Sequence, residues 1–129
     1  MTRKKLPPRR GHINQSVTIG GKVRLYVGVD SDEPKELWLR VKGEGITSLV
    51  VALCDQQAIS TARRLQRGET LEEICGPWVG VKVEPCGVVK GDERIKMCTS
   101  ILDYLGRYLL VYCAGRDDLA HVPKPEKAL

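Results

Sequence analysis

The stretch INQSVTIGGKVRLYVGV, residues 13–29, decides the fold of this chain. Apolar and polar residues alternate on both sides of Gly20-Gly21, which predicts two strands, over 13–19 and 22–29, joined as a hairpin. Successive side chains of a strand point to opposite faces, so the second strand has two unlike faces. One is apolar, with Val23, Leu25, Val27 and Val29; the other carries Lys22, Arg24 and Tyr26.

The same alternation continues after a turn at 30–34 and predicts a third strand over 35–42. Its inward residues are Leu37, Leu39 and Val41, and its outward residues are Glu36, Trp38, Arg40 and Lys42. The three strands should form an antiparallel meander with one apolar face and one cationic face.

Helical spacing replaces the alternation after residue 45. The longest predicted helix covers 48–67, and its apolar stripe is Leu49, Val50, Leu53, Ala58, Ala62 and Leu65. Thr70 and Glu73 form a capping box for a short helix that ends at Gly76-Pro77. A last helix, over 99–113, has the stripe Ile101, Leu102, Leu105, Leu109 and Tyr112. The predicted fold class is α+β, a meander packed against two main helices and one short helix.

The charges divide the 129 residues into three parts. A basic, flexible arm (1–12) holds Arg3, Lys4, Lys5, Arg9 and Arg10, which account for the whole net charge of +5. The rest has 21 − 5 = 16 basic and 16 acidic residues, so the single domain expected over 13–115 and the polar tail over 116–129 are neutral together. We therefore expect no nucleic-acid partner for the folded body, although binding through the arm is an alternative.

Composition also bears on the cellular location of the protein. No apolar run approaches the roughly 20 residues that cross a bilayer, and no apolar segment follows the basic N-terminus as in a secretory signal. Five cysteines without regular spacing favour reduced thiols, so we expect a cytoplasmic protein without a membrane partner.

Catalytic patterns are absent from the sequence. It contains no CxxC, HExxH, GxSxG or phosphate loop, and His12 and His121 fall in the arm and the tail. We expect no enzyme activity, no cofactor and no metal site. Cys98 is the exception to consider: beside Lys96 and a helix start, its thiol pKa should be lowered, with a buried, inert thiol as the alternative.

The stretch EPCGVVKGDERIKMCTSILDYLGRYLL, residues 84–110, is the first candidate binding site. A helix N-terminus attracts phosphate, and glycines let the backbone approach a ligand. The candidate residues are Gly87, Lys90, Gly91, Asp92, Arg94, Lys96, Thr99, Ser100 and Arg107, with Arg40 and Arg64 as further cations. The alternative is a charged surface loop before a capped helix, in which Arg107 pairs with Asp103.

The cationic strand face is the second candidate. Trp38 and Tyr26 lie among Arg24, Arg40 and Lys42, a mixture that suits a base stacked above a phosphate. Solvent-facing cations on an exposed sheet are the alternative. Trp78 fits either a stacking platform or a core anchor.

Several segments together resemble a known family: KLPPRR (5–10), VTIGG (17–21), LWLRVKGEG (37–45), RGETLEEI (67–74), VEPCGVVKGDERIKMCTSILDYLGRYL (83–109) and GRDDLAHV (115–122). They are similar to the C-terminal TSCPD accessory domain of adenosylcobalamin-dependent ribonucleotide reductases, which we expect to be free-standing here. The resemblance implies an accessory module without the catalytic barrel. The chain departs from the family pattern at Val83 and Asp92, where Phe and Asn are usual.

A looser similarity links the chain to phage anti-defence proteins that counter Thoeris immunity by sequestering cyclic ADP-ribose signals in oligomers. We therefore expect a non-catalytic module that captures a nucleotide or an ADP-ribose-type ligand, as a homo-oligomer. The alternative is an accessory domain that acts with a separate reductase catalytic subunit.

Overall fold

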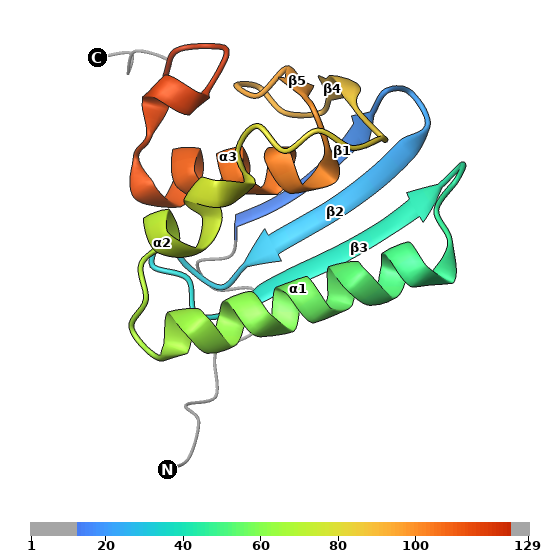
Figure 1. Cartoon of the computed structure of the whole chain (residues 1–129). Helices are drawn as coiled ribbons and strands as arrows, with labels where there is room; N and C mark the ends of the chain where they lie inside the picture. Colours follow the sequence, from blue (N-terminus) through green and yellow to red (C-terminus); the bar gives the residue numbers. More distant parts are fainter. Residues whose placement is uncertain (1–12, 125–129) are drawn as a thin grey trace.

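The computed structural model of the chain describes residues 13–124. The basic arm expected over 1–12 and the last five residues of the expected tail lie outside this range. Five strands form one sheet in the order β3-β2-β1-β4-β5 (Figure 1). They are β1 (Ile13–Ile19), β2 (Val23–Val29), β3 (Leu37–Gly43), β4 (Gly87–Lys90) and β5 (Met97–Cys98). The neighbouring strands pair antiparallel. This confirms the predicted fold class.

The β1–β2 hairpin has a three-residue loop, one residue longer than the glycine pair predicts. Ile19 pairs with Val23, and Lys22 lies in the loop. Ile19 and Val23 are both buried, and paired residues share a face of the sheet. A two-residue loop would have placed Ile19 opposite Lys22, so the apolar pattern selects the longer turn.

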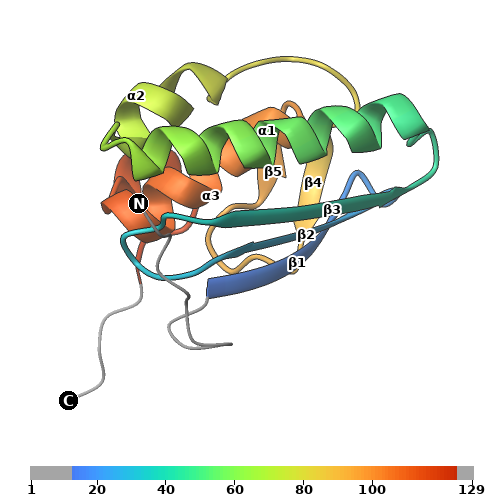
Figure 2. The same cartoon turned by 90° about the horizontal axis from the view of Figure 1, so that it is seen from below.

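The helices lie on one face of the sheet. They are α1 (Ser48–Gln66), α2 (Leu71–Cys75) and α3 (Ile101–Ala114), with short 3₁₀ turns η1 (Gly76–Trp78) and η2 (Asp117–Leu119). The core between sheet and helices contains Val17, Ile19, Leu25, Ile74, Tyr104, Leu105, Tyr108 and Leu109. Figure 2 shows α1 and α3 above β1–β3; within residues 13–124 no helix covers the opposite face.

Helix α1 covers the sheet mainly with its C-terminal half. Ala58, Ala62 and Leu65 are buried as predicted, whereas Leu49 and Leu53 are 66% and 60% exposed. The prediction was wrong for these two leucines because the stripe joined residues on different sides of the helix. At 3.6 residues per turn, Leu53 lies about 140° and Leu49 about 180° around the axis from Ala58.

Residues 116–122 fold back onto the loop between β4 and β5. The backbone N–H groups of His121 and Val122 donate to the Arg94 carbonyl, and the N–H of Lys96 donates to Nδ1 of His121. Leu119 packs against the core. Among the described residues, no helix has the length and apolar character needed to cross a membrane.

Candidate functional site

Asp92 is the centre of a buried hydrogen-bond network in the β4–β5 loop. Its side chain is only 1% exposed and accepts four hydrogen bonds. Oδ1 accepts from the N–H groups of Arg94 and Ile95, both at 2.9 Å, and from the Tyr112 hydroxyl at 2.6 Å. Oδ2 accepts from the Tyr104 hydroxyl at 2.8 Å. The carboxylate therefore occupies the position in the loop that a bound anion would take.

The network lowers the pKa of Asp92. Burial alone would raise this pKa, but the hydrogen bonds from Tyr112, Ile95, Arg94 and Tyr104 outweigh it. Burial and the bond to Asp92 also raise the pKa of Tyr112, so its hydroxyl stays protonated as a donor. The ionised carboxylate is thus the form that the folded chain stabilises.

This shift predicts a loss of stability in acid. The unfolded carboxyl, with the ordinary pKa of 3.8, takes up a proton at higher pH than the folded one. The contribution of Asp92 is therefore complete above pH 3.8 and falls as pH drops through the lower folded pKa. Urea titrations at pH 7, 4 and 3 check this: the gap in unfolding free energy between wild type and Asp92→Asn should narrow towards pH 3. A constant gap would contradict the assignment.

The N-terminus of α3 is also capped from within the chain. Oγ of Ser100 accepts from the N–H of Asp103 at 2.8 Å. The Asp103 carboxylate accepts from the N–H groups of Gly80 and Thr99, at 2.7 and 2.9 Å. Arg107 donates to Asp103 at 3.1 Å and to the Leu119 carbonyl at 2.8 Å. Ser100 is thus the N-cap of α3, and the Asp103–Arg107 pair of the alternative interpretation forms.

The cations of this loop bind the tail and the loop backbone. Arg94 is buried; it pairs with Asp117 at 2.9 Å and donates to the Val122 carbonyl at 3.2 Å. Lys96 donates through Nζ to the Asp92 carbonyl at 2.6 Å. A phosphate in this loop would have to displace these partners, so the geometry favours the structural alternative for the first candidate site.

The glycines of the predicted site approach protein backbone. Gly91, at φ +106°, lies against β1, where an added Cβ would stand 2.5 Å from the Ser16 carbonyl oxygen. A Cβ on Gly87, at φ +123°, would stand 3.4 Å from the Cα of Gly20. Lys90 lies at the exposed end of β4, paired with Thr18.

The other predicted residues lie elsewhere in the fold. Arg64 pairs with Glu69 at 2.7 Å beside α2. Trp78 is 7% exposed in the core, which resolves its two interpretations in favour of an anchor. Arg40 lies on the outer side of β3. The structure thus brings 87–100 and Arg107 together but leaves Arg40 and Arg64 apart from them.

The predicted low pKa of Cys98 was wrong. Burial, and then the charge of Asp103, raises the pKa of this thiol to about 11. Lys96, the cation expected to lower it, donates instead to the Asp92 carbonyl. Cys98 is therefore a buried, inert thiol.

Cysteine labelling should follow burial. With iodoacetamide at pH 8, we expect the exposed Cys86 to react first and Cys98 to react only on unfolding, since about 0.1% of a thiol of pKa 11 is ionised there. Mass spectrometry of timed samples checks this, and Cys86→Ser is the control that should remove the fast phase. Equal rates at the two thiols would contradict the prediction.

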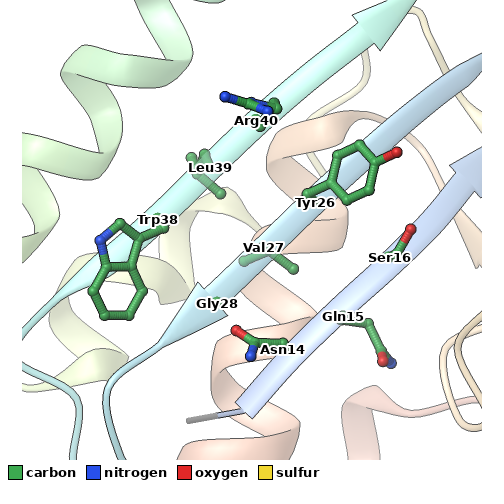
Figure 3. Close-up of a pocket in the computed structure, with 9 residues that line it drawn as sticks. All are labelled: Asn14, Gln15, Ser16, Tyr26, Val27, Gly28, Trp38, Leu39 and Arg40. Atoms are coloured by element: carbon green, nitrogen blue, oxygen red, sulfur yellow. The ribbon is translucent and has the colours of Figure 1, made fainter. Parts of the chain in front are cut away.

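The uncovered face of the sheet contains an open hollow of about 710 Å³. Figure 3 shows its side chains: Trp38 and Arg40 come from β3, Tyr26 from β2, and Asn14 and Ser16 from β1. Gln15, Val27, Gly28 and Leu39 complete the lining. The hollow belongs to the second site predicted from the sequence.

Gly28 forms the floor of the hollow. It pairs with Asn14 on one side and Trp38 on the other. An added Cβ would collide with Oδ1 of Asn14 and lie 3.6 Å from Cε3 of Trp38. The Asn14 amide therefore occupies the space that a side chain at position 28 would fill, next to the indole ring of Trp38, which remains 47% exposed.

Cations lie beside the hollow on the same face. Strand pairing aligns Ser16, Tyr26 and Arg40 in one row, and the next row is Lys90, Thr18, Arg24 and Lys42. Nζ of Lys42 lies 5.7 Å from the centre of the Tyr26 ring. We call these rows, together with Asn14, Gly28 and Trp38, the outer face. It can offer an aromatic surface, hydrogen-bonding groups and positive charge.

Sequence reasoning missed Asn14, Ser16 and Gly28 as parts of this face. The signal was present in the register: once Ile19 is placed opposite Val23, Asn14 must oppose Gly28. The roles of Tyr104 and Tyr112 had no local signal, because both lie more than ten residues from Asp92.

In the described part of the chain, His, Cys, Asp and Glu form no group of three or more that could hold a metal ion. No protein-family model matches the chain, and no solved structure matches it.

Curated proteins similar to the chain are much longer. A vitamin B12-dependent ribonucleotide reductase of Agrobacterium fabrum is 42% identical over 122 residues, which are 93% of this chain and 9% of that reductase. The reductase of Bradyrhizobium diazoefficiens is 36% identical over 96% of this chain and 10% of its own length. The reductase of Streptantibioticus cattleyicolor is 32% identical over 83% of this chain and 18% of its own length. The chain is therefore homologous to a small segment of vitamin B12-dependent ribonucleotide reductases.

Proposed function

We propose that this chain is a non-catalytic accessory module of a vitamin B12-dependent ribonucleotide reductase, acting with a catalytic part outside these 129 residues. The observation that carries the proposal is the coverage: the similarity spans 93% of this chain but 9% of the Agrobacterium fabrum reductase. Because nearly all of this chain matches one short segment of that enzyme, the segment is expected to form a domain of its own beside the much larger remainder of the reductase.

A segment exchange tests this proposal. The matched segment of the Agrobacterium fabrum reductase is deleted in one variant and replaced by this chain in another. We expect the replacement to recover ribonucleotide reduction that the deletion loses. A replacement that folds, remains soluble and is as inactive as the deletion would count against an accessory role.

Capture of a nucleotide or a cyclic ADP-ribose-type molecule is the second candidate function. The outer-face hollow favours it. Trp38 provides a ring for a base, Arg40 a guanidinium for a phosphate, and Asn14 an amide for a base edge or a hydroxyl. The hollow replaces the β4–β5 loop as the place for the ligand, because the donors of that loop have internal partners.

A thermal-shift screen of mono-, di- and cyclic nucleotides tests capture. A ligand at 100 times its Kd adds about 2.7 kcal/mol to the free energy of unfolding. We expect such a shift for wild type and its loss in Trp38→Ala. Light scattering with and without the ligand measures the oligomeric state, for which a homo-oligomer remains the prediction.

A further inference from the structure

We propose that the outer face binds single-stranded nucleic acid, with a base stacked on Trp38 and phosphates held by Arg40, Lys42, Arg24 and Lys90. The inference uses the hollow of the second candidate function, but it names a polymer as the ligand. It does not depend on the accessory role in a reductase.

Charge segregation is the first argument. None of the five strands contains Asp or Glu, although they carry four cations, Arg24, Arg40, Lys42 and Lys90. All four are exposed. The neutral balance of the chain beyond the arm therefore conceals a sheet whose charges are all positive, and such a surface complements a polyanion.

Two acidic residues that flank the strands, Asp30 and Glu36, have hydrogen-bond donors elsewhere in the fold. Asp30, just after β2, is buried and accepts from the N–H groups of Lys35 and Glu36 at 2.9 Å. Glu36, just before β3, accepts from the side chain of Gln66 at 3.3 Å. Both carboxylates are thus bound within the turn between β2 and β3 or to α1.

The spacing of the rows is the second argument. Rows of a sheet are about 6.8 Å apart and neighbouring strands about 4.8 Å apart. From the row of Trp38 to the row of Lys42 is thus about 14 Å, and four strands contribute. Sheets of four strands with exposed aromatic residues stack two or three bases of a single strand. The outer face has this size, with a ring at one end and three cations in a row at the other.

The hollow over Gly28 is the third argument. Beside Trp38 the sheet lacks a side chain on β2, and the Asn14 amide lies over Gly28 instead, so a base stacked on the exposed side of the indole ring has this amide as its neighbour. Tyr26 lies diagonally across from Trp38, about 7 to 8 Å away along the sheet surface. Lys42 lies over the Tyr26 ring, where it meets a phosphate rather than a second base.

Fluorescence anisotropy of the full chain with fluorescein-labelled dT8 and rU8 tests the inference. We expect binding to at least one oligomer, with a log–log salt slope near −3 for about four phosphate contacts. Trp38→Ala should weaken binding about tenfold, whereas Trp38→Phe should retain most of it, because a ring and not a particular side chain is needed. Arg40→Ala should weaken binding and flatten the salt slope by about 0.7.

Matched variants separate this face from the rest of the chain. Arg63→Ala removes an exposed cation on α1 and should change little. Gly28→Ala forces the Asn14 amide to move within the hollow without changing charge and should weaken binding. A variant with Arg3, Lys4, Lys5, Arg9 and Arg10 replaced by Ser should still bind.

Several outcomes would overturn the inference. They are no binding of either oligomer, loss of binding only in the arm variant, equal effects of Arg40→Ala and Arg63→Ala, or competition by dTMP and AMP as strong as that by the oligomers. Competition by mononucleotides as strong as that by the oligomers would still support nucleotide capture. Binding of an oligomer without a thermal shift by any nucleotide would support the polymer site alone. Circular dichroism of each variant confirms that it is folded.

Discussion

Asp92→Ala is expected to lower the free energy of unfolding by about 3 to 5 kcal/mol, a large part of the stability of a single domain. The substitution leaves four donors without an acceptor: the buried N–H groups of Arg94 and Ile95, the buried hydroxyl of Tyr104 and the partly buried hydroxyl of Tyr112. Each unpaired buried group costs about 1 to 3 kcal/mol before the structure relaxes. Urea denaturation followed by circular dichroism measures the loss.

Two further variants provide comparisons for the effect of Asp92→Ala. Glu93→Ala alters an exposed neighbour and should change stability by less than about 0.5 kcal/mol. Tyr112→Phe removes one donor and leaves the carboxylate with three, so it should cost less than Asp92→Ala. If Asp92→Ala were as mild as Glu93→Ala, the network would not support the fold as described.

Gly91→Ala should cost about 2 to 4 kcal/mol, the second large effect. Gly91 combines a φ of +106° with a backbone contact: its added Cβ would lie 2.5 Å from the Ser16 carbonyl oxygen and 3.3 Å from the Cα of Val17. Both are main-chain atoms of β1, so the strand cannot give way without breaking its pairing with β2. The cost of the strained φ angle and the cost of overpacking against β1 therefore both lower the free energy of unfolding. Thermal and urea unfolding measure the cost.

Gly80 is a matched control for the backbone conformation alone. Its φ is +89°, and an added Cβ meets nothing within 4 Å. Gly80→Ala should therefore cost about 1 kcal/mol, the strain of a left-handed residue. Equal costs at the two glycines would mean that the loop moves away from β1 freely.

Much of the fold follows from local pattern. The alternation in 13–42 predicted three strands and their faces, and Thr70 with Glu73 forms the capping box at α2. β4 and β5 were not predicted as strands because they are only four and two residues long, and β4 joins the sheet by pairing with β1, which is distant in sequence. The exposure of Leu49 and Leu53 follows from their positions around the axis of α1, away from Ala58, which the predicted stripe overlooked.

The candidate sites divide in a similar way. Outward cations and Trp38 were predictable because strand alternation alone places them. The β4–β5 loop was interpreted as an anion site because Lys90, Arg94 and Lys96 surround it, but those charges do not reveal that Asp92 turns inward. That direction depends on the hydroxyls of Tyr104 and Tyr112 on α3, which only the tertiary structure brings within 2.8 Å.

The inward carboxylate also bears on how the domain opens. Loops are usually the first segments whose amide hydrogens exchange with solvent, because few bonds restrain them. The amides of Arg94 and Ile95 are instead tied through Asp92 to two side chains of α3. Exposing these amides requires that α3 separate from the loop. The amide hydrogens of Arg94 and Ile95 should therefore exchange about as slowly as those of the core strands.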